Sequence, residues 1–511
     1  MTFKVGEPRL THMTRLLSNL FIAISALLLS ACSNSSTRPS AKHPNLLLIA
    51  IDDLRPELNA YGKSFIKSPN IDRLASSGVT FTRAYCNVPV CGASRASLFS
   101  GVRPGYNRFL FHYAQASIEV PEVATLPEHL KKNGYTTLSV GKIFHTPADS
   151  EHKAWSDTPY RFDHHRLEDG SWSDKGWQNY ITEENIAIAK TASNGAAWPW
   201  EKAEVDDSTY LDGIYADKAI DYLRSRKDSE KPFFLCLGFL KPHLPFNAPS
   251  KYWDLYDRKN IELANNPFFP KNAPNQAAFN WGELRSYYGV PSGGPVSEEM
   301  ATTLRHGYYA CVSATDALVG KVMVELEKLG LADDTIVILM GDHGYNLGEH
   351  GLWNKHVNFE TALRTPLIIS GPGVTQGKAN GIVEYVDLYP TVLELAGIPK
   401  PDHVLQGTSL SPMLRDPNAI VKDFAISKWM QGVTLIGERY FYSEWHDKDR
   451  NRTARMLYDH ERDPHENINI AELEENESLV GTLSATLNQN LNKHYWAPSI
   501  GNYSHRLHRN Y

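Results

Sequence analysis

The chain has 511 residues, of which 42% are hydrophobic and 22% are charged. That composition is typical of a globular protein with a large core, and it excludes a disordered or membrane-embedded chain. The formal net charge of −6 argues against a nucleic acid as the partner, so an anionic ligand would need a local basic pocket.

The N-terminal region predicts a targeting segment. A basic start leads into an apolar stretch at residues 16–31 that is short for a membrane span. The stretch ends in Leu-Ser-Ala-Cys, which resembles a bacterial lipobox, so we expect cleavage before Cys32 and acylation of that residue. Residues 1–31 are then a lipoprotein signal peptide and residues 32–43 a Ser/Pro-rich tether, which would anchor the protein in the bacterial cell envelope, at the outer membrane. The alternative is a plain signal peptide with an incidental cysteine.

Four apolar runs, each about one strand long, end in polar residues. They occupy residues 46–51, 137–140, 233–239 and 336–340, and a stretch between them at residues 304–329 has helical periodicity. Continuous apolar runs are typical of parallel strands that are covered on both faces. Because open α/β sheets bind ligands at the carboxyl ends of their strands, we expect the polar residues after these runs to share one site. Those residues are Asp52, Asp53, Lys142, His145, Lys241, His243, Asp342 and His343.

Cys91 lies beside a short predicted helix that ends at Gly101. Ser94 is expected to cap that helix and Gly101 to stop it. The positive end of the helix favours an anion beside Cys91, and Arg95 adds a guanidinium group. Taken alone, the same segment also fits a buried structural cysteine before an ordinary helix.

The remaining cysteines predict no disulfide framework. Cys236 and Cys311 lie in apolar runs and are expected to be buried thiols. Cys86 is close enough in sequence to pair with Cys91, although we expect it to stay a thiol.

Two insertions interrupt the pattern, at residues 150–210 and 258–297. The first insertion contains five tryptophans, which either pack it onto the body of the protein or stack on sugar rings; they are Trp155, Trp172, Trp177, Trp198 and Trp200.

The C-terminal part has a different pattern. Residues 426–436 and 440–445 predict antiparallel strands around a turn at residues 437–438, and a polar helix is expected near residues 472–492. We therefore expect a catalytic domain over residues 44–415 and a smaller α+β subdomain over residues 416–511.

The order of the motifs across residues 44–471 resembles that of the type I sulfatases. The matching segments are residues 52–53, 91–101, 141–145, 241–243, 341–344 and 347–355. Within that family the chain looks most like the iduronate 2-O-sulfatase branch and its bacterial polysaccharide-degrading relatives. The resemblance implies an alkaline-phosphatase-like α/β fold, in which a mixed, mostly parallel sheet is sandwiched by helices. It also implies that Cys91 is oxidised to formylglycine, whose hydrate is the nucleophile.

The resemblance implies a Ca²⁺ site as well. Asp52, Asp53 and Asp342 would supply hard oxygen ligands, with the modified Cys91 also at the ion. His343 would either bind the ion or orient the formylglycine hydrate. The alternative for one such aspartate is a helix cap, which fits three of them poorly.

The same resemblance implies the roles of the remaining site residues. Lys142 and Lys355 would hold the sulfate oxygens and Arg95 would support the hydrate. His243 would protonate the leaving sugar oxygen and His145 would deprotonate the hydrate to expel sulfate, although these two roles could be exchanged.

We therefore expect a calcium-dependent sulfatase that acts on sulfated oligosaccharides or polysaccharides, either algal ones such as ulvan or glycosaminoglycans, with a 2-O-sulfate favoured. A formylglycine-generating maturation enzyme would be its partner, and Ala93, where many family members have proline, would limit which maturation systems accept the chain. One alternative is a phosphodiesterase or phosphonate hydrolase of the same superfamily, for which a Ser or Thr nucleophile and two metals are typical. The other is a non-catalytic glycan-binding lipoprotein with a decayed site.

Overall fold

The computed structural model describes residues 1–2, 43–162, 165–166, 172–173, 176, 178–279 and 282–496. The chain divides into two units, Met1–His43 and Pro44–Tyr511, and the fold described here is that of the second. Cys32 and the expected signal peptide and tether lie almost wholly outside the described residues. Within the described ranges, no helix combines the length and the apolar character that a membrane crossing requires.

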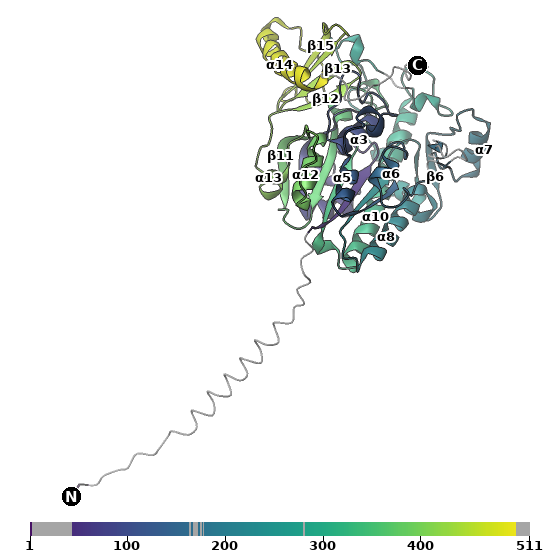
Figure 1. The fold of residues 1–511 in the computed structure, drawn as a ribbon. Helices are drawn as coiled ribbons and strands as arrows, with labels where there is room; N and C mark the ends of the chain where they lie inside the picture. Colours follow the sequence, from purple (N-terminus) through teal and green to yellow (C-terminus); the bar gives the residue numbers. More distant parts are fainter. Residues whose placement is uncertain are drawn as a thin grey trace. The chain divides into compact units, whose positions relative to one another are not determined.

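In the described part of the chain, seven strands form the main sheet, in the order β11-β2-β10-β9-β1-β7-β3 (Figure 1). The four predicted runs are neighbours at one side of it and are all parallel. They are β1 (Asn45–Ile51), β3 (Thr136–Gly141), β7 (Phe233–Phe239) and β9 (Thr335–Gly341). The sheet is completed by β2 (Gly78–Tyr85), β10 (Arg364–Ser370) and β11 (Gly377–Glu384), with β10 antiparallel to both of its neighbours. The expected mixed, mostly parallel sheet is confirmed.

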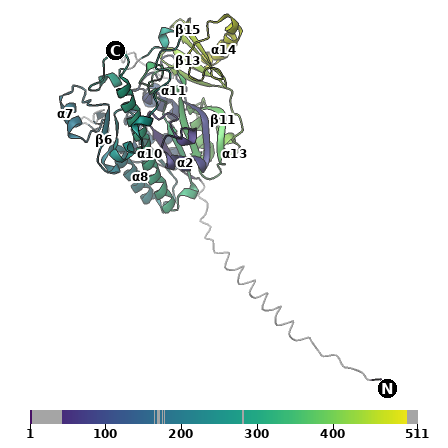
Figure 2. The ribbon, with the colours of Figure 1, turned by 180° about the vertical axis from the view of Figure 1, so that it is seen from behind.

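Helices cover both faces of the sheet because successive side chains of a strand point to opposite sides. In β1, Leu47 and Ile49 belong to one buried cluster, while Leu46 and Leu48 belong to another. The helices of the first face, seen in Figure 2, are α2 (Pro69–Ser76), α8 (Leu211–Arg226) and α10 (Glu298–Lys328). Those of the second face are α3 (Cys91–Ser100), α5 (Leu126–Lys132) and α12 (Leu388–Ala396).

Short elements connect these layers. They are α4 (Ala116–Glu119), α6 (Glu151–Ala154), β4 (His165–Arg166), β5 (Trp172–Ser173), α7 (Glu183–Thr191), β6 (Trp200–Ala203), β8 (Phe246–Pro249), α9 (Ser250–Trp253), α11 (Glu360–Leu363) and α13 (Ser411–Arg415). In the first insertion, Trp155 is buried against Phe144, and Trp198 stacks on Trp200 with ring centres 5.2 Å apart. These tryptophans pack the insertion onto itself and onto the body, whereas Trp177 lies outside the described residues.

The C-terminal part forms an antiparallel sheet with one covering helix. Its elements are β12 (Ala425–Trp429), β13 (Gly432–Ile436), β14 (Tyr440–His446), β15 (Arg452–Asp459) and α14 (Glu477–Asn490). The turn between β13 and β14 lies where it was expected. The single strand expected over residues 426–436 is wrong, because the chain turns at Met430, whose φ is +51°. No Gly, Pro, Asn or Asp occupies positions 430–431, so the sequence carried no signal for that turn.

The cysteines of the described residues are all thiols. Cys86, Cys91, Cys236 and Cys311 are buried and unpaired with one another, which confirms the expectation for Cys236 and Cys311. Cys86 points its sulfur toward the carbonyl of Ala362, 3.8 Å away, and forms no disulfide with Cys91.

Candidate active site

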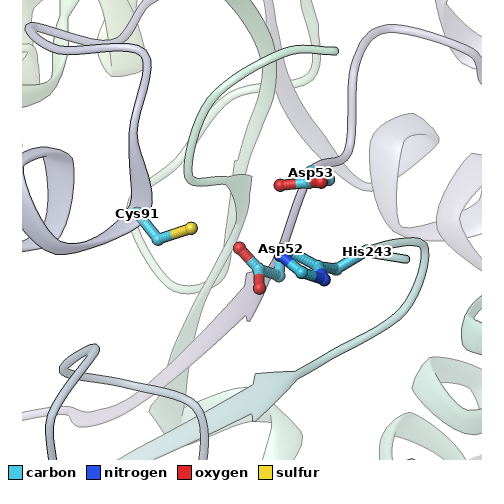
Figure 3. A group of neighbouring side chains, drawn as sticks. All are labelled: Asp52, Asp53, Cys91 and His243. Carbon is cyan, nitrogen blue, oxygen red and sulfur yellow. The ribbon is translucent and has the colours of Figure 1, made fainter. Parts of the chain in front are cut away.

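The carboxyl ends of the four parallel strands deliver charged side chains to one place. Asp52 and Asp53 follow β1, Asp342 follows β9, Lys142 follows β3 and His243 lies beyond the end of β7. Figure 3 shows Asp52, Asp53 and His243 gathered on one side of a shared space, with the Cys91 sulfur pointing into it from the other side. The convergence predicted from the strand ends is therefore present.

Cys91 is the first residue of α3, preceded by Val90 in an extended conformation. The expectation that Ser94 caps this helix is wrong, because the helix begins three residues earlier. The Ser94 hydroxyl instead donates to the carbonyl of Asp342, 2.6 Å away, and so ties α3 to the end of β9. Gly101 ends the helix at φ +66°, as expected. Cys91 thus lies at the positive end of a helix dipole, where an anion is favoured.

Gly92 allows a neighbouring loop to approach the site. A Cβ atom at this position would lie 1.7 Å from the carbonyl oxygen of His112, so no larger residue fits. The His112 ring lies 5.6 Å from that of His145, and Arg161 holds the His145 carbonyl through a 3.1 Å hydrogen bond. His145 thereby lies next to the loop that packs on Gly92, while the clusters of closely spaced ligand atoms among the described residues do not include it.

The carboxylates fit a Ca²⁺ ion. Ligand atoms of Asp52, Asp53, Cys91 and His243 lie within 4.8 Å of one another, and so do those of Asp52, Cys91, Asp342 and His343. The Oδ1 atoms of Asp52 and Asp53 are buried and have no hydrogen-bond partner, which is costly unless a cation binds them. Three carboxylates form a donor set of hard oxygens, the kind that Ca²⁺ prefers.

His343 faces both Cys91 and the carboxylates. Its Nδ1–H donates to the carbonyl of Gly344 at 3.0 Å, which turns Nε2 toward the site. Nε2 lies 3.3 Å from the Cys91 sulfur and 3.5 Å from Oδ1 of Asp53. This position is compatible with either of the two roles expected for His343.

Three buried cations surround the carboxylates. Lys142 bonds to Asp52, Arg95 Nε donates to Oδ2 of Asp342 at 2.9 Å, and Lys355 Nζ lies 3.0 Å from Oδ2 of Asp53. Arg95 also donates to the carbonyl of Ile143 at 2.9 Å, which fixes the segment that carries Lys142. The cations that the family resemblance places around sulfate therefore lie beside the proposed ion site.

Burial and charge shift the pKa values of the paired aspartates in opposite directions. Burial by itself raises the pKa of Asp52, but Lys142 and then His243 hold it well below its ordinary value. Burial raises the pKa of Asp53 to about 7, against Lys355 and with the help of the Asp52 charge. Two ionised carboxylates this close repel one another unless a cation lies beside them, which agrees with their fit to Ca²⁺.

Two residues of the site were not predicted from the sequence. Glu283, from the second insertion, contacts His243 and Lys355, and no motif marks it because its surroundings are irregular. His356 is also buried, and its ring lies 4.8 Å from that of Trp429. Burial and then Lys355 hold the pKa of His356 well below its ordinary value. The position of His356 directly after Lys355 was the sequence feature that could have indicated its place in the site.

A buried charge network fixes the loop at residues 345–355, which carries Lys355. Arg55 donates to the carbonyl of Tyr345 at 3.1 Å and to Oε1 of Glu349 at 3.0 Å. Arg305 donates to the same Oε1 at 2.8 Å and to the carbonyl of Leu347 at 2.9 Å. One carboxylate therefore links this loop to α10 and to the segment that follows Asp53.

We expect Glu349→Gln to lower the free energy of unfolding by about 3–5 kcal/mol, because it leaves two buried guanidinium groups without their shared charge. Burial by itself raises the pKa of Glu349, but Arg55 and Arg305 lower it to about 2 from the ordinary 4.5. The stabilisation is therefore present above pH 4.5 and is lost as the pH falls through 2. Denaturant unfolding at neutral pH measures the difference in the free energy of unfolding between the wild type and this variant.

Glu57→Gln is the matched control, since Glu57 bonds to Arg55 and leaves Glu349 in place. A smaller loss is expected for this variant. Equal losses for both variants would contradict the central position of Glu349.

Comparison with known proteins found two matching family models and similar relatives. A sequence model described as Sulfatase matches residues 44–398, and one described as N-sulphoglucosamine sulphohydrolase, C-terminal, matches residues 348–493. The chain is 35% identical over 394 residues to iduronate 2-sulfatase of Mus musculus, a match that covers 70% of this chain and 69% of that relative.

Solved structures share the fold. A protein solved in complex with its substrate D-glucosamine-2-N,6-O-disulfate matches with a TM-score of 0.68 and 21% identity, over 90% of this chain and 100% of that chain. A phosphonate monoester hydrolase of Agrobacterium radiobacter matches with a TM-score of 0.70 and 21% identity, over 88% and 96%. At these identities the likeness concerns the fold alone.

Proposed function

This chain belongs to the sulfatase family and is a hydrolase of sulfate esters, and from that premise we propose that it removes sulfate from oligosaccharides with the help of Ca²⁺ and of a formylglycine formed at Cys91. The observation that carries the proposal is the buried cluster itself. Cys91 lies at a helix N-terminus within 4.8 Å of carboxylate oxygens, and Lys142 and Lys355 lie beside those carboxylates.

Each component of the cluster has a distinct part in the proposed reaction. Ca²⁺, held by Asp52, Asp53 and Asp342, would supply positive charge beside the sulfate, and formylglycine would supply the nucleophile. Lys142 and Lys355 would bind sulfate oxygens in a site from which water is largely excluded.

The histidines of the site would handle protons. His243, whose Nδ1 lies 2.7 Å from the carbonyl of Leu244, presents Nε2 toward the cluster, where it would protonate the leaving oxygen. His145, whose ring lies 5.6 Å from that of His112, would accept a proton from the group at position 91. Lys241 bonds to the carbonyls of His243 and Pro245 and fixes the loop that carries His243.

The substrate class follows from the relative in the comparison. Because that relative is named iduronate 2-sulfatase, a 2-O-sulfate on a uronic acid is the first bond to test. Algal polysaccharides such as ulvan and glycosaminoglycans are the two proposed sources of the substrate.

We expect sulfate release to be at least about 100-fold faster from the preferred 2-O-sulfated disaccharide than from its 6-O- and N-sulfated isomers. An isomer whose sulfate is misplaced would leave polar groups of the buried site unpaired. Ion chromatography measures the released sulfate. A phenyl phosphonate monoester is included as the comparator for the alternative reaction. Faster hydrolysis of the phosphonate than of every sulfate ester would contradict the proposed function.

Acylation of Cys32 and anchoring in the bacterial envelope remain part of the proposal, supported by the sequence of residues 16–32. The maturation enzyme is likewise a proposed partner. Cys91 is only 2% exposed in the folded chain, which supports its modification before folding is complete.

A further inference from the structure

We propose that Glu283 is a positioning residue that holds the proton donor His243 and the sulfate-binding Lys355 in one fixed arrangement. The inference rests on the proposed function and adds to it a residue from the second insertion. It begins from a single carboxylate that contacts two of the proposed catalytic groups.

The contacts of Glu283 constrain both partners. Its Oε1 lies 3.2 Å from Nε2 of His243, and its Oε2 lies 3.1 Å from Nζ of Lys355. On the opposite side of the ring, Nδ1 of His243 lies 2.7 Å from the carbonyl of Leu244. A carboxylate and a carbonyl both accept hydrogen bonds, so they hold the plane of the imidazole from two sides whenever both ring nitrogens carry protons.

Lys355 is held in a similar way. Its ammonium lies between Oε2 of Glu283 and Oδ2 of Asp53, with the two N–O distances at 3.1 and 3.0 Å. Glu283 therefore links the proton donor to a cation that also contacts the ion site. All of these side chains are at most 15% exposed, so water screens the contacts weakly.

The position of Glu283 is itself fixed by the core, although the segment lacks a long element. The residues that follow form a single turn, η5 (Leu284–Ser286), and the amide and hydroxyl of Ser286 donate to the carbonyl of Glu283 at 3.1 and 2.7 Å. Leu284 and Tyr287 are buried in the same cluster as α8 and α10. The carboxylate is thus presented by an anchored turn.

The chemistry explains why such a residue is useful. When the bond between sulfur and the leaving sugar oxygen breaks, its electron pair goes to that oxygen, which must take a proton. The proton comes from Nε2 of the protonated His243, which gives up its hydrogen bond to Oε1 of Glu283 as the proton moves to the leaving oxygen, and the ring is left neutral with Nδ1–H still bonded to Leu244. Glu283 stays ionised and paired with Lys355. A carboxylate that fixes a catalytic imidazole contributes through orientation, and the contribution is largest when the leaving oxygen is most basic.

The test replaces Glu283 by glutamine, which keeps the size of the side chain and removes its charge. We expect kcat for a sugar sulfate to fall about 100-fold, but kcat for 4-nitrophenyl sulfate to fall less than about 3-fold, because nitrophenolate leaves without a proton. With a series of substituted phenyl sulfates, kcat of E283Q should therefore depend more steeply on leaving-group pKa than kcat of the wild type does. In a His243→Ala background, E283Q should add little further loss on the sugar sulfate.

Glu298→Gln, at the exposed start of α10, is the matched control. It should change neither kcat nor the dependence of kcat on leaving-group pKa. The inference is overturned if E283Q lowers kcat by the same factor for every leaving group. It is also overturned if KM falls while kcat is unchanged, because Glu283 would then merely compete with sulfate for Lys355. If E283Q does not fold, Glu283→Asp, which retracts the carboxylate by one methylene, should show the same steepened dependence. Absence of sulfate release by the wild-type enzyme would instead refute the proposed function.

Discussion

Replacing Cys91 by alanine is expected to lower kcat for sulfate release by about 10⁴-fold or more, as removal of a nucleophile does in other hydrolases. Position 91 starts a helix and faces the carboxylates, Nε2 of His343 and the proposed ion site. The cations and the ion can polarise the sulfate ester, but they cannot attack sulfur. The alanine variant should still bind substrate, so KM should change much less than kcat.

Cys86→Ala is the matched control, because Cys86 is also a buried thiol but bonds toward the carbonyl of Ala362, outside the cluster. This control should keep its kcat, even if its stability falls. Mass spectrometry of the peptide that contains residue 91 adds a second measurement: active protein should carry the aldehyde there. Fully active protein with an unmodified thiol, or an active alanine variant, would refute the nucleophile.

Removal of Ca²⁺ by a chelator is the second prediction with a large effect, and we expect kcat/KM to fall by about 10³-fold and to recover when Ca²⁺ is added back. Asp52 and Asp53 each bury an oxygen without a hydrogen-bond partner, and Asp342 completes the carboxylate set. Binding should also stabilise the fold. At a free concentration of 100 times Kd, the free energy of unfolding should rise by about 2.7 kcal/mol, which thermal unfolding reports without any substrate.

The variant Asp53→Asn should lose most of this Ca²⁺-dependent stabilisation, because the amide removes one charged ligand. Asp316→Asn is the matched control. Asp316 is also a buried carboxylate, but it accepts hydrogen bonds from the backbone of Asn70 and Ile71 in α2 and belongs to neither cluster of ligand atoms. The control should be less stable and still respond to Ca²⁺. A stabilisation by Ca²⁺ that is unchanged in Asp53→Asn would place the ion elsewhere.

Apolar runs and the residues at their ends allowed much of the fold and site to be predicted. The four parallel strands were identified because each is buried on both faces and therefore continuously apolar, a pattern that depends on local sequence. Asp52, Lys142, His243 and Asp342 could be assigned to one place because parallel strands end at the same edge of a sheet. The turn at Met430 and the start of α3 were missed, since neither depends on a residue with a strong local preference.

The sequence by itself determined which chemical groups are present and which strand each one follows. Only the tertiary structure decided that Glu283 contacts His243 and Lys355, and that Glu349 joins Arg55 to Arg305. These partners lie 40 or more residues apart in the sequence, in short or irregular segments and in α10. Their contacts follow from how buried surfaces pack and from the need of each buried charge for a partner, and neither requirement leaves a periodic mark in the chain.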